Sequence, residues 1–410
     1  MLKGAILGGL AALALWLTPA TVAAPNAAAP APQIKRFVVH GVYTREQRSL
    51  LVRQGFDIGE GYWADHVELY GTDAQARRLS LSGMRTQRVP LTPDDFPPPD
   101  SNYHNYAEMV ADLQAVAAAR PNIVHLFSLG TSYEGRQIVG ARVSDDATDN
   151  LNEPGVFFVG QHHAREHLTV EVVLSLLHLF SGMTPSAAND VSELVRTRQI
   201  YIVPSLNPDG AEYDIAGGSY GYWRKNRQPN PNAIGTDNNR NYSYRWGCCG
   251  GSDGYGGGET YRGPNPLSAP ENQRMRDFMI AHPNVKTGIS YHTYGELVLY
   301  PYGYTYTDEP PDMDHTDHLT FMAMGAAMEQ TTGYHAQQSS DLYITDGDWN
   351  DWMYGELHRY PITIEMAGYG YGFYPPDEYI PVEIRRNWQA AIFDAKIADC
   401  PRRIVGASCS

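Results

Sequence analysis

From about Asn105 onward, the chain alternates apolar, β-rich runs with stretches of helical periodicity, and this alternation constrains the fold more than any other feature. We expect strands at 124–129, 137–143, 155–160, 200–204, 286–292 and 362–365, and helices at 106–119, 168–180, 270–281 and 318–333. The pattern is typical of an α/β fold in which helices flank both faces of a mixed central β-sheet. In open sheets of this class, ligands bind beyond the carboxyl ends of the strands.

The N-terminus predicts export. A basic start, an apolar run over residues 4–17 and small residues at 21–24 indicate a secretory signal peptide over residues 1–24. The apolar run is shorter than the roughly 20 residues that a membrane span needs, so we expect no membrane association after signal removal. The protein is therefore expected to be secreted and extracellular.

A small unit precedes the main domain. Residues 25–32 are almost all Ala and Pro, and a second stretch at 91–100 is crowded with Pro and Asp. Both compositions are typical of linkers. Between them, an apolar β-like run at 37–39, a helical stretch at 44–54 and extended residues near 66–70 predict a small α+β unit. The order of signal, small unit, exposed linker and large domain suggests a zymogen.

Charge and cysteine content exclude some partners. The formal net charge of −15, with no cluster of Lys and Arg, argues against nucleic acid binding. Four cysteines fit an exported chain and allow three pairings, of which we favour Cys248 with Cys249 and Cys400 with Cys409. None of the four has zinc-site spacing to a neighbouring histidine, so we expect structural disulfides.

A histidine and a glutamate stand three residues apart just beyond the predicted strand 155–160. By itself the spacing of His163 and Glu166 is a weak signal, because a chain with 14 histidines is expected to contain about one such pair by chance, and a polar surface turn explains it equally well. A catalytic zinc site needs a third protein ligand and leaves a fourth position for water. His292, which ends the predicted strand 286–292, is the candidate.

Zinc-dependent hydrolysis also requires a base near the attacking water. Glu365 stands at the end of the apolar run 362–365. The alternative is a strand-end glutamate that faces solvent, since a glutamate is seldom buried without a partner. A metal ion and a positive neighbour would favour the catalytic interpretation.

Eight ordered motifs carry a resemblance to a known family. They include His-His-Ala-Arg-Glu-His at 162–167, Asn-Pro-Asp-Gly at 207–210, Trp-Arg-Lys-Asn-Arg at 223–227 and Thr-Ile-Glu-Met at 363–366. The others lie at 239–241, 259–263, 291–294 and 340–348. Over roughly 95–409 the chain resembles the carboxypeptidase A family of zinc carboxypeptidases and is most similar to the bacterial carboxypeptidase T branch. The resemblance implies a propeptide at 25–94 and a catalytic domain at 95–410.

The resemblance also implies roles for individual residues. The zinc ligands would be His163, Glu166 and His292, with Glu365 as the general base. Arg224 would hold the developing oxyanion. The substrate would be a peptide or protein with a free C-terminal carboxylate, which a planar guanidinium can bind through both oxygens. This carboxylate and the peptide chain leading to it would be bound by Asn239, Arg240, Arg165 and the mobile Tyr343.

Side-chain specificity and calcium are further expectations from the resemblance. The pocket for the C-terminal side chain maps to positions that include Leu299, Leu342, Asp348 and Thr363. An inward-facing Asp348 predicts hydrophobic C-terminal residues with tolerance of basic ones, and an outward-facing one predicts hydrophobic residues only. The acidic loop 144–153 suggests a structural Ca²⁺ site, and a solvated acidic turn is the alternative.

Two other functions stay open at this point. A catalytically silent binding module on the same fold is disfavoured because the base, the arginine and all three ligands occur together. A zinc amidase or endopeptidase that cuts cell-wall peptides is disfavoured by Asn239, Arg240 and Tyr343, which suit a free carboxylate. The chain has no Gly-x-Ser-x-Gly motif of a serine hydrolase. No motif suggests an oligomer, so we expect a monomer.

Overall fold

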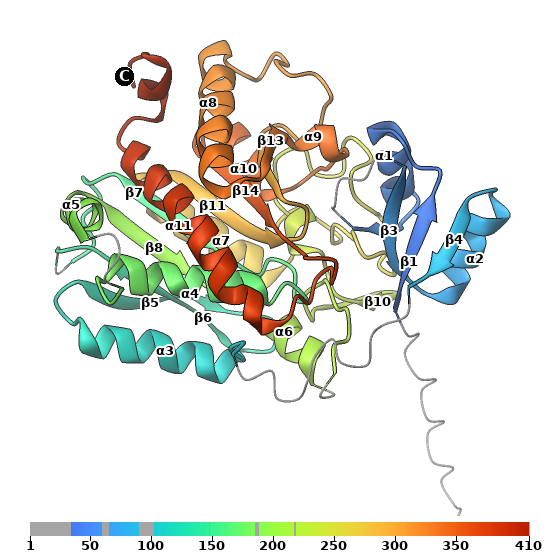
Figure 1. Cartoon of the computed structure of the whole chain (residues 1–410), viewed down its shortest axis with the longest axis horizontal. Coiled ribbons are helices and arrows are strands. Elements are labelled where there is room, and N and C mark those ends of the chain that lie inside the picture. The colour runs from blue at the N-terminus through green and yellow to red at the C-terminus, as the bar shows by residue number, and fades with distance from the viewer. Residues whose placement is uncertain are drawn as a thin grey trace, which may run out of the picture. The chain divides into compact units, whose positions relative to one another are not determined.

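An eight-stranded mixed β-sheet forms the centre of the main domain in the computed structural model (Figure 1). Its strand order is β13-β12-β14-β11-β7-β8-β6-β5. Strands β14, β11, β7 and β8 run parallel to one another. Antiparallel pairings join β12 to β14, β6 to β8 and β5 to β6, and β13 pairs with β12 in parallel. The strands are β5 (Val124–Thr131), β6 (Gln137–Val143), β7 (Gly155–Val159), β8 (Gln199–Val203), β11 (Val285–Thr293), β12 (Leu297–Tyr300), β13 (His335–Gln338) and β14 (Tyr360–Met366).

The structure describes residues 34–59, 65–89, 102–146, 148–184, 188–216 and 219–409, without the side chains of 188–190. Residues 34–410 form one compact unit. The predicted signal peptide and both predicted linkers lie outside the described residues. None of the described helices is long and apolar enough to cross a membrane.

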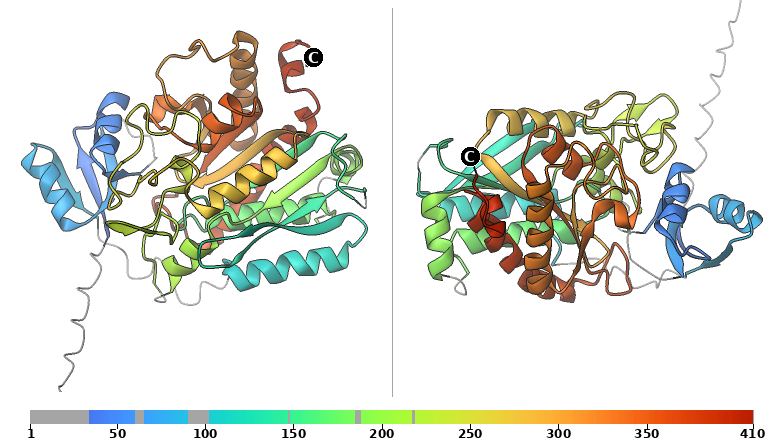
Figure 2. Two further views of the ribbon diagram at one scale, coloured as in Figure 1. Left: turned by 180° about the vertical axis from the view of Figure 1, so that it is seen from behind. Right: turned by 90° about the horizontal axis from the view of Figure 1, so that it is seen from above.

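Helices cover both faces of the sheet, as the alternation predicts (Figure 2). Successive side chains of a strand point to opposite faces. In β7, Val156 and Phe158 therefore pack into one core cluster and Phe157 and Val159 into another. The first cluster includes residues of α3 (Tyr106–Ala119), α4 (Leu168–Phe180), α5 (Ala188–Thr197), α8 (His315–Thr332) and α11 (Ile380–Ile397). The second includes residues of α7 (Pro270–Ala281) and α10 (Trp349–Gly355).

Residues 34–89, here called the N-terminal segment, form the predicted small α+β unit. Two Thr-x-x-Gln capping boxes, at Thr44 and Thr72, start its helices. Its sheet is antiparallel with the order β2-β3-β1-β4. The elements are β1 (Lys35–His40), α1 (Arg45–Arg53), β2 (Asp57–Ile58), β3 (His66–Gly71), α2 (Asp73–Leu81) and β4 (Arg85–Arg88).

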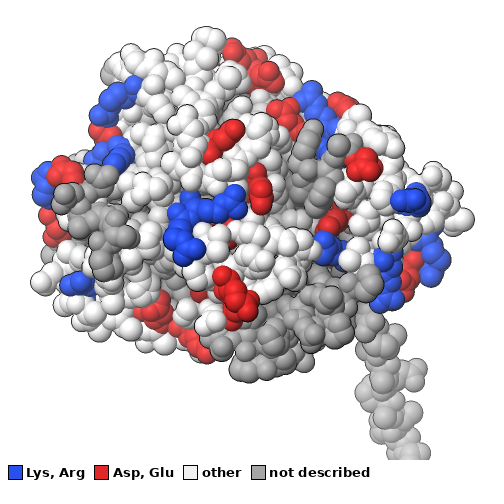
Figure 3. All heavy atoms as spheres, viewed as in Figure 1, with Lys and Arg blue, Asp and Glu red and all other residues white. Residues whose placement is uncertain are grey.

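Short elements and two disulfides complete the fold. The disulfides join Cys248 to Cys249 and Cys400 to Cys409, which confirms the favoured pairing. Figure 3 shows acidic and basic side chains interspersed over the face that it displays. The short elements are α6 (Pro208–Ile215), β9 (Pro229–Asn230), β10 (Ala233–Ile234), η2 (Asn238–Arg240), α9 (Ser339–Leu342), η3 (Asp377–Tyr379) and η4 (Pro401–Val405).

Candidate active site

The three predicted metal ligands meet at the carboxyl ends of adjacent parallel strands. His292 lies near the end of β11, and β7, which pairs with β11 in parallel, ends at Val159. The chain then turns through 160–167 before α4 begins, and this turn carries His163 and Glu166. Because both strands end at the same edge of the sheet, residues more than a hundred positions apart come together there.

The three side chains point their ligand atoms at one another. His163 Nδ1 lies 2.7 Å from Glu166 Oε1, and His292 Nδ1 lies 2.9 Å from Glu166 Oε2. The two Nδ1 atoms are 3.2 Å apart. All three side chains are buried, and one ligand atom from each lies within 4.8 Å of the others. Two imidazoles and a carboxylate are a common zinc donor set, which leaves a coordination position for water, so the residues fit a catalytic zinc ion.

A second group of possible ligands lies in the N-terminal segment. His40, Asp65 and His66 also place ligand atoms within 4.8 Å of one another, but the two histidines are half-buried and Asp65 is exposed. A catalytic zinc site requires a dry, shaped cavity around the ion. The buried group of His163, Glu166 and His292 meets this requirement, and the exposed group does not.

Asp237 connects the metal ligands to Arg224, and the sequence did not single it out. Its Oδ1 lies 3.1 Å from His163 Nε2, and its Oδ2 accepts a hydrogen bond of 3.0 Å from Arg224 Nε. Burial alone would raise the pKa of Asp237, but Arg224 and His163 hold it well below its usual range. A carboxylate on the outer nitrogen of a ligating histidine fixes the ring and raises its basicity. The sequence clue is the run Asp-Asn-Asn-Arg that ends in Arg240.

His162 is turned away from the ligand group. Its Nδ1 is 3.0 Å from Ser290 Oγ, and its Nε2 is 2.9 Å from the hydroxyl of Tyr242. Burial and the neighbouring histidines hold the pKa of His162 well below its usual range, so the ring is neutral. Of the two adjacent histidines, only His163 therefore contributes to the metal group.

Glu365 stands directly beside His292. The two residues are register partners in the parallel strands β14 and β11, and Glu365 is buried. Its side chain borders a cavity. The cavity is lined by Asn239, Arg240, Leu299, Ser339, Leu342, Tyr343, Thr345, Asp348, Asn350, Thr363 and Glu365. The structure thus gathers at one cavity the predicted base and seven of the eight predicted substrate-binding residues, all but Arg165.

Arg240 and Asn239 are held rigidly at this cavity. Arg240 is buried, and its Nε donates to the carbonyl oxygen of Gly251 at 3.0 Å. Asn239 accepts a hydrogen bond of 2.9 Å from the backbone N–H of Trp349 through its side-chain oxygen. These contacts leave the guanidinium of Arg240 bordering the cavity, where it can bind an anion.

Arg165 contacts the N-terminal segment. Its guanidinium binds both carboxylate oxygens of Asp57, with Nη2 2.9 Å from Oδ1 and a shorter contact between Nη1 and Oδ2. The guanidinium carbon lies 3.8 Å from the ring centroid of Phe373. Tyr343 packs in a core cluster with Phe37, Val39 and other residues of the segment. The same cluster contains Leu299 and Leu342, so the N-terminal segment packs with or binds four of the residues that were expected to bind substrate.

Asp348 lines the cavity, but both of its carboxylate oxygens already accept hydrogen bonds. Oδ1 accepts from the N–H of Asp351 at 2.9 Å, and Oδ2 accepts a short hydrogen bond from the hydroxyl of Thr345. Burial raises the pKa of Asp348. Gly303 packs closely against this carboxylate, since a side-chain Cβ at position 303 would lie only 2.8 Å from Asp348 Oδ2.

The carboxylates of the acidic loop 144–153 accept hydrogen bonds from protein donors, and the side-chain amide of Gln199 donates to two of them, Asp146 and Glu153. Asp146 Oδ2 accepts from Asn150 at 2.8 Å, and Glu153 Oε2 accepts from Gln199 at 2.9 Å. Asp149 binds Tyr201 and His282. Among the described residues, this loop does not bring three such carboxylates together.

Comparison with known proteins decides the family. A family model described as zinc carboxypeptidase matches residues 109–390, a range that contains the ligand group, Arg224, Glu365 and the cavity residues. The chain belongs to the zinc carboxypeptidase family. This assignment makes it a metallocarboxypeptidase, a zinc-dependent hydrolase.

Relatives of this zinc carboxypeptidase are similar over much or all of its length. A zinc carboxypeptidase from Saccharothrix mutabilis subsp. capreolus is 38% identical over 440 aligned positions, which cover 100% of this chain and 98% of the relative. A carboxypeptidase B from Astacus astacus is 31% identical and covers 68% of this chain and 91% of the relative. The resemblance to the carboxypeptidase T branch in particular stays a prediction.

The fold of this zinc carboxypeptidase also matches solved structures. The crystal structure of carboxypeptidase A from Helicoverpa armigera superposes with a TM-score of 0.75 at 21% identity, and covers 92% of this chain and 98% of that one. At this identity the match supports the fold alone, and it confirms the predicted α/β architecture.

Proposed function

We propose that this zinc carboxypeptidase is secreted as a zymogen whose mature form removes the C-terminal residue from peptides, with hydrophobic and also basic residues accepted. The observation that carries the proposal is the cavity that Glu365 and Arg240 both line. Beside it lies the buried group of His163, Glu166 and His292. A hydrolytic centre and a site for an anion are thereby adjacent.

His163, Glu166 and His292 would hold zinc, which when bound polarises water and the scissile carbonyl. Glu365 would accept a proton from the attacking water and pass it to the leaving amine. Arg224, which is held by the hydrogen bond from its Nε to Asp237, would stabilise the developing oxyanion. A preorganised donor of this kind typically contributes about 2.7–4 kcal/mol to lowering the barrier.

Recognition of a free C-terminus would depend on Arg240. Its guanidinium is buried at the cavity wall, where a carboxylate would be shielded from water, and charge-assisted hydrogen bonds are stronger there. Asn239 would contribute from the same wall, and Tyr343 would close over the substrate once the N-terminal segment has left. Arg165 would then bind the peptide chain further upstream.

The pocket suits apolar side chains and holds one acidic group. Leu299 and Leu342 line it together with Thr363, and Asp348 faces the same cavity. When ionised, Asp348 would pair with the cation of a substrate Lys or Arg. Because its oxygens already accept two hydrogen bonds, we expect hydrophobic residues to be preferred and basic ones to be accepted less well.

The contacts of the N-terminal segment support the zymogen assignment. Asp57 of the segment binds Arg165. The hydroxyl of Tyr70, also in the segment, lies 2.7 Å from the hydroxyl of Tyr294 in the main domain. Glu68 accepts a short hydrogen bond from Tyr294. A segment that binds the enzyme's own substrate-binding groups would compete with substrate until it is removed.

Export, the monomeric state and structural calcium are predictions that we retain from the sequence. For calcium at the acidic loop 144–153, the competing protein donors argue for weak binding at most. Chelation of calcium with zinc held constant should lower the melting temperature if the ion is structural, and an unchanged melting temperature would count against it.

The test is release of free amino acid from acyl dipeptides by the processed enzyme. Glu365→Gln should remain loaded with zinc and lose activity, whereas the matched control Glu378→Gln, at an exposed position, should keep it. Removal of zinc should abolish release, and zinc should restore it. A wild-type enzyme that cuts only C-terminally amidated peptides at internal bonds would overturn the proposal in favour of an endopeptidase.

A further inference from the structure

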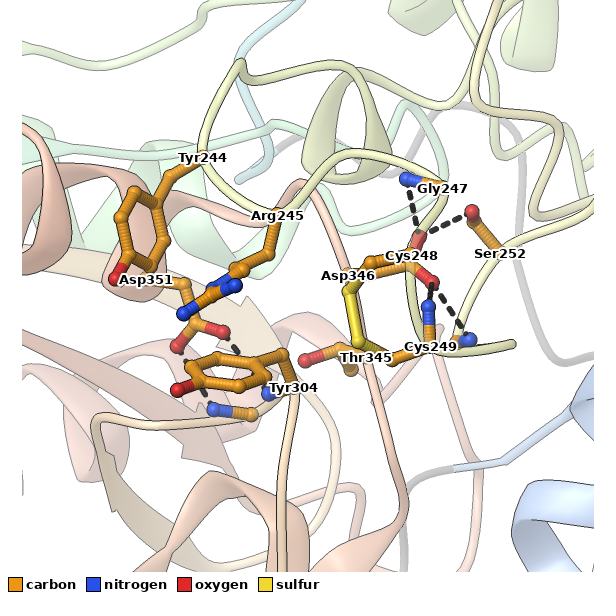
Figure 4. Close-up of a disulfide and its surroundings, with 12 residues drawn as sticks. Tyr244, Arg245, Gly247, Cys248, Cys249, Ser252, Tyr304, Thr345, Asp346 and Asp351 are labelled. Carbon is orange, nitrogen blue, oxygen red and sulfur yellow. Dashed lines mark hydrogen bonds between the residues drawn. A yellow bond between two sulfur atoms is a disulfide. The ribbon is translucent and has the colours of Figure 1, made fainter. Parts of the chain in front are cut away.

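The loop that carries the Cys248–Cys249 disulfide surrounds a buried carboxylate (Figure 4). Asp346 accepts hydrogen bonds from the backbone N–H groups of Gly247 at 3.2 Å, Cys249 at 3.2 Å and Gly251 at 2.8 Å. The hydroxyl of Ser252 donates a further short bond. Four donors on one fully buried side chain fix the loop 247–252 in a single conformation.

The far end of this loop supports the substrate site. The carbonyl oxygen of Gly251 accepts the Nε bond of Arg240, the residue proposed to bind the substrate carboxylate. Gly251 also packs against Thr345 of the pocket. A side-chain Cβ at position 251 would lie only 2.3 Å from the carbonyl carbon of Thr345, so the two backbones are in close contact. The hydroxyl of Thr345 in turn binds Asp348. A displacement of the loop would therefore move both Arg240 and the side-chain pocket.

The near end of the loop is anchored to Tyr304, whose neighbour Gly303 packs against the pocket residues Thr345 and Asp348. Arg245 binds Asp312 at 2.6 Å and lies over the ring of Tyr304, with its guanidinium carbon 4.7 Å from the ring centroid. The backbone N–H of Tyr304 donates to Asp351 at 2.9 Å, as does that of the preceding Gly303 at 2.7 Å. The two cysteines thus stand between two anchored ends. Gly251 packs against Thr345 of the pocket, and Arg245 contacts Tyr304, the neighbour of Gly303.

The disulfide constrains the Cys248–Cys249 peptide bond, whose N–H binds Asp346. Because Cys248 and Cys249 are adjacent, their bond closes a small ring that contains the peptide bond between them. The N–H of that peptide bond is the Cys249 donor to Asp346. Closing the ring removes alternative conformations of this unit, which an open pair of cysteines could adopt. Cys248 is exposed, so a reductant can reach the bond.

We propose that the Cys248–Cys249 disulfide is a positioning element for substrate binding, which holds Arg240 and the Thr345 wall in place, so that its reduction weakens binding of the C-terminal residue. This inference rests on the proposed carboxypeptidase function. Neither cysteine touches the reacting atoms or the metal ligands, and the effect is therefore expected in KM and not in kcat.

In the precursor, the N-terminal segment covers part of this loop. A Cβ at Gly250 would lie 2.6 Å from Nε of Arg53, the last residue of α1. We therefore expect the disulfide to be less accessible to a reductant before processing than after it. Cys248 is exposed even with this segment in place, so a reductant can reach the bond in both forms.

The experiment compares three forms processed from the full-length chain at the predicted linker: wild type, Cys248→Ser/Cys249→Ser and the control Cys400→Ser/Cys409→Ser. Wild type is also reduced with a phosphine, which cleaves the S–S bond to two thiols and takes oxygen from water to become its oxide. The phosphine is removed before assay, and the zinc content is measured.

We expect KM for an acyl dipeptide to rise about tenfold in the reduced enzyme and the Cys248→Ser/Cys249→Ser variant, a loss of about 1.4 kcal/mol, because Arg240 would no longer be held in place for the substrate carboxylate. The value of kcat, the zinc content and the control variant should be unchanged, and reoxidation should restore KM. Hydrogen exchange at residues 247–252 should accelerate in the same two forms.

Two results would overturn the proposal. One is an unchanged KM in an active enzyme whose disulfide is demonstrably open. The other is unchanged hydrogen exchange at 247–252 in the reduced enzyme, a readout that does not depend on activity. If even the oxidised wild type releases no amino acid, the proposed function fails, and the exchange rates still decide whether the disulfide orders the loop.

Discussion

Asp57 and Arg165 form a buried, two-bond ion pair between the N-terminal segment and the turn that carries the metal ligands. Removing one partner of such a pair typically costs about 3–5 kcal/mol, because it leaves a buried charge uncompensated. In the precursor, Asp57→Asn should therefore loosen the segment and raise peptidase activity by at least about tenfold. The measurement is dipeptide hydrolysis by the unprocessed chain.

The matched control for this prediction is Asp73→Asn. Asp73 pairs with Lys35 inside the same segment and is half exposed, so its loss should not affect contact with the enzyme. The role of Asp57 in inhibition would be contradicted if the Asp57→Asn precursor were as inactive as the wild-type precursor, provided that the processed enzyme is active.

Asp237 should control how tightly zinc binds. It orients His163 through Nε2, and loss of such a partner typically lowers metal affinity by about 10–100-fold. We expect Asp237→Asn to reduce zinc affinity to this extent in competition with a chelator. Asp277→Asn, an exposed position on α7, is the control. Equal zinc affinities for the two variants would contradict the role of Asp237.

Acceptance of basic residues should depend on the charge of Asp348. Burial raises its pKa above the ordinary value of 3.8, so the ionised fraction grows as pH rises through that higher value. The ratio of kcat/KM for C-terminal Arg over Leu should rise with pH. Asp348→Asn should lower the ratio by about tenfold or more and remove its pH dependence, since a hydrogen bond to a charged group contributes about 1.5–3 kcal/mol. If Asp348→Asn does not change the ratio, Asp348 does not recognise basic residues, and the pocket has a purely hydrophobic preference.

The sequence predicted the centre of the fold well because local pattern and burial agree there. The helices at 106–119, 168–180 and 270–281 have the predicted bounds, and the central strands differ by one or two residues at their ends. His292 and Glu365 were expected at strand ends, and the register of β11 and β14 makes them neighbours.

Elements whose burial depends on distant partners were missed. Helix α11 was not predicted, and Glu383, Asn387 and Asp394 interrupt its buried face with polar groups. Glu383 is accommodated by Tyr334 and Tyr369, which belong to other parts of the chain. The role of Asp237 likewise depends on His163, which is 74 positions away. Sequence periodicity carries no signal of such contacts.

A pH-dependent contact links the start of the main domain to α4. His104 donates its backbone N–H to Glu171 Oε1 at 2.6 Å, and its Nδ1 lies 2.8 Å from Oε2 of the same carboxylate. The hydrogen bond to Glu171 raises the pKa of His104 above its ordinary value of 6.5. The stabilisation from the charged ring is therefore complete below pH 6.5 and is lost as pH rises through the higher, folded-state pKa.

We expect His104→Gln to lower the melting temperature more at about pH 6 than at a pH above the folded-state pKa of His104, where the wild-type ring is neutral as well. His315→Gln is the control, because that side chain is 68% exposed. The comparison should use the zinc-loaded chain at both pH values, so that loss of metal from the buried histidines does not enter the difference. A gap between wild type and His104→Gln that is constant over this pH range would mean that the backbone bond to Glu171, and not the charge on the ring, holds the two elements together.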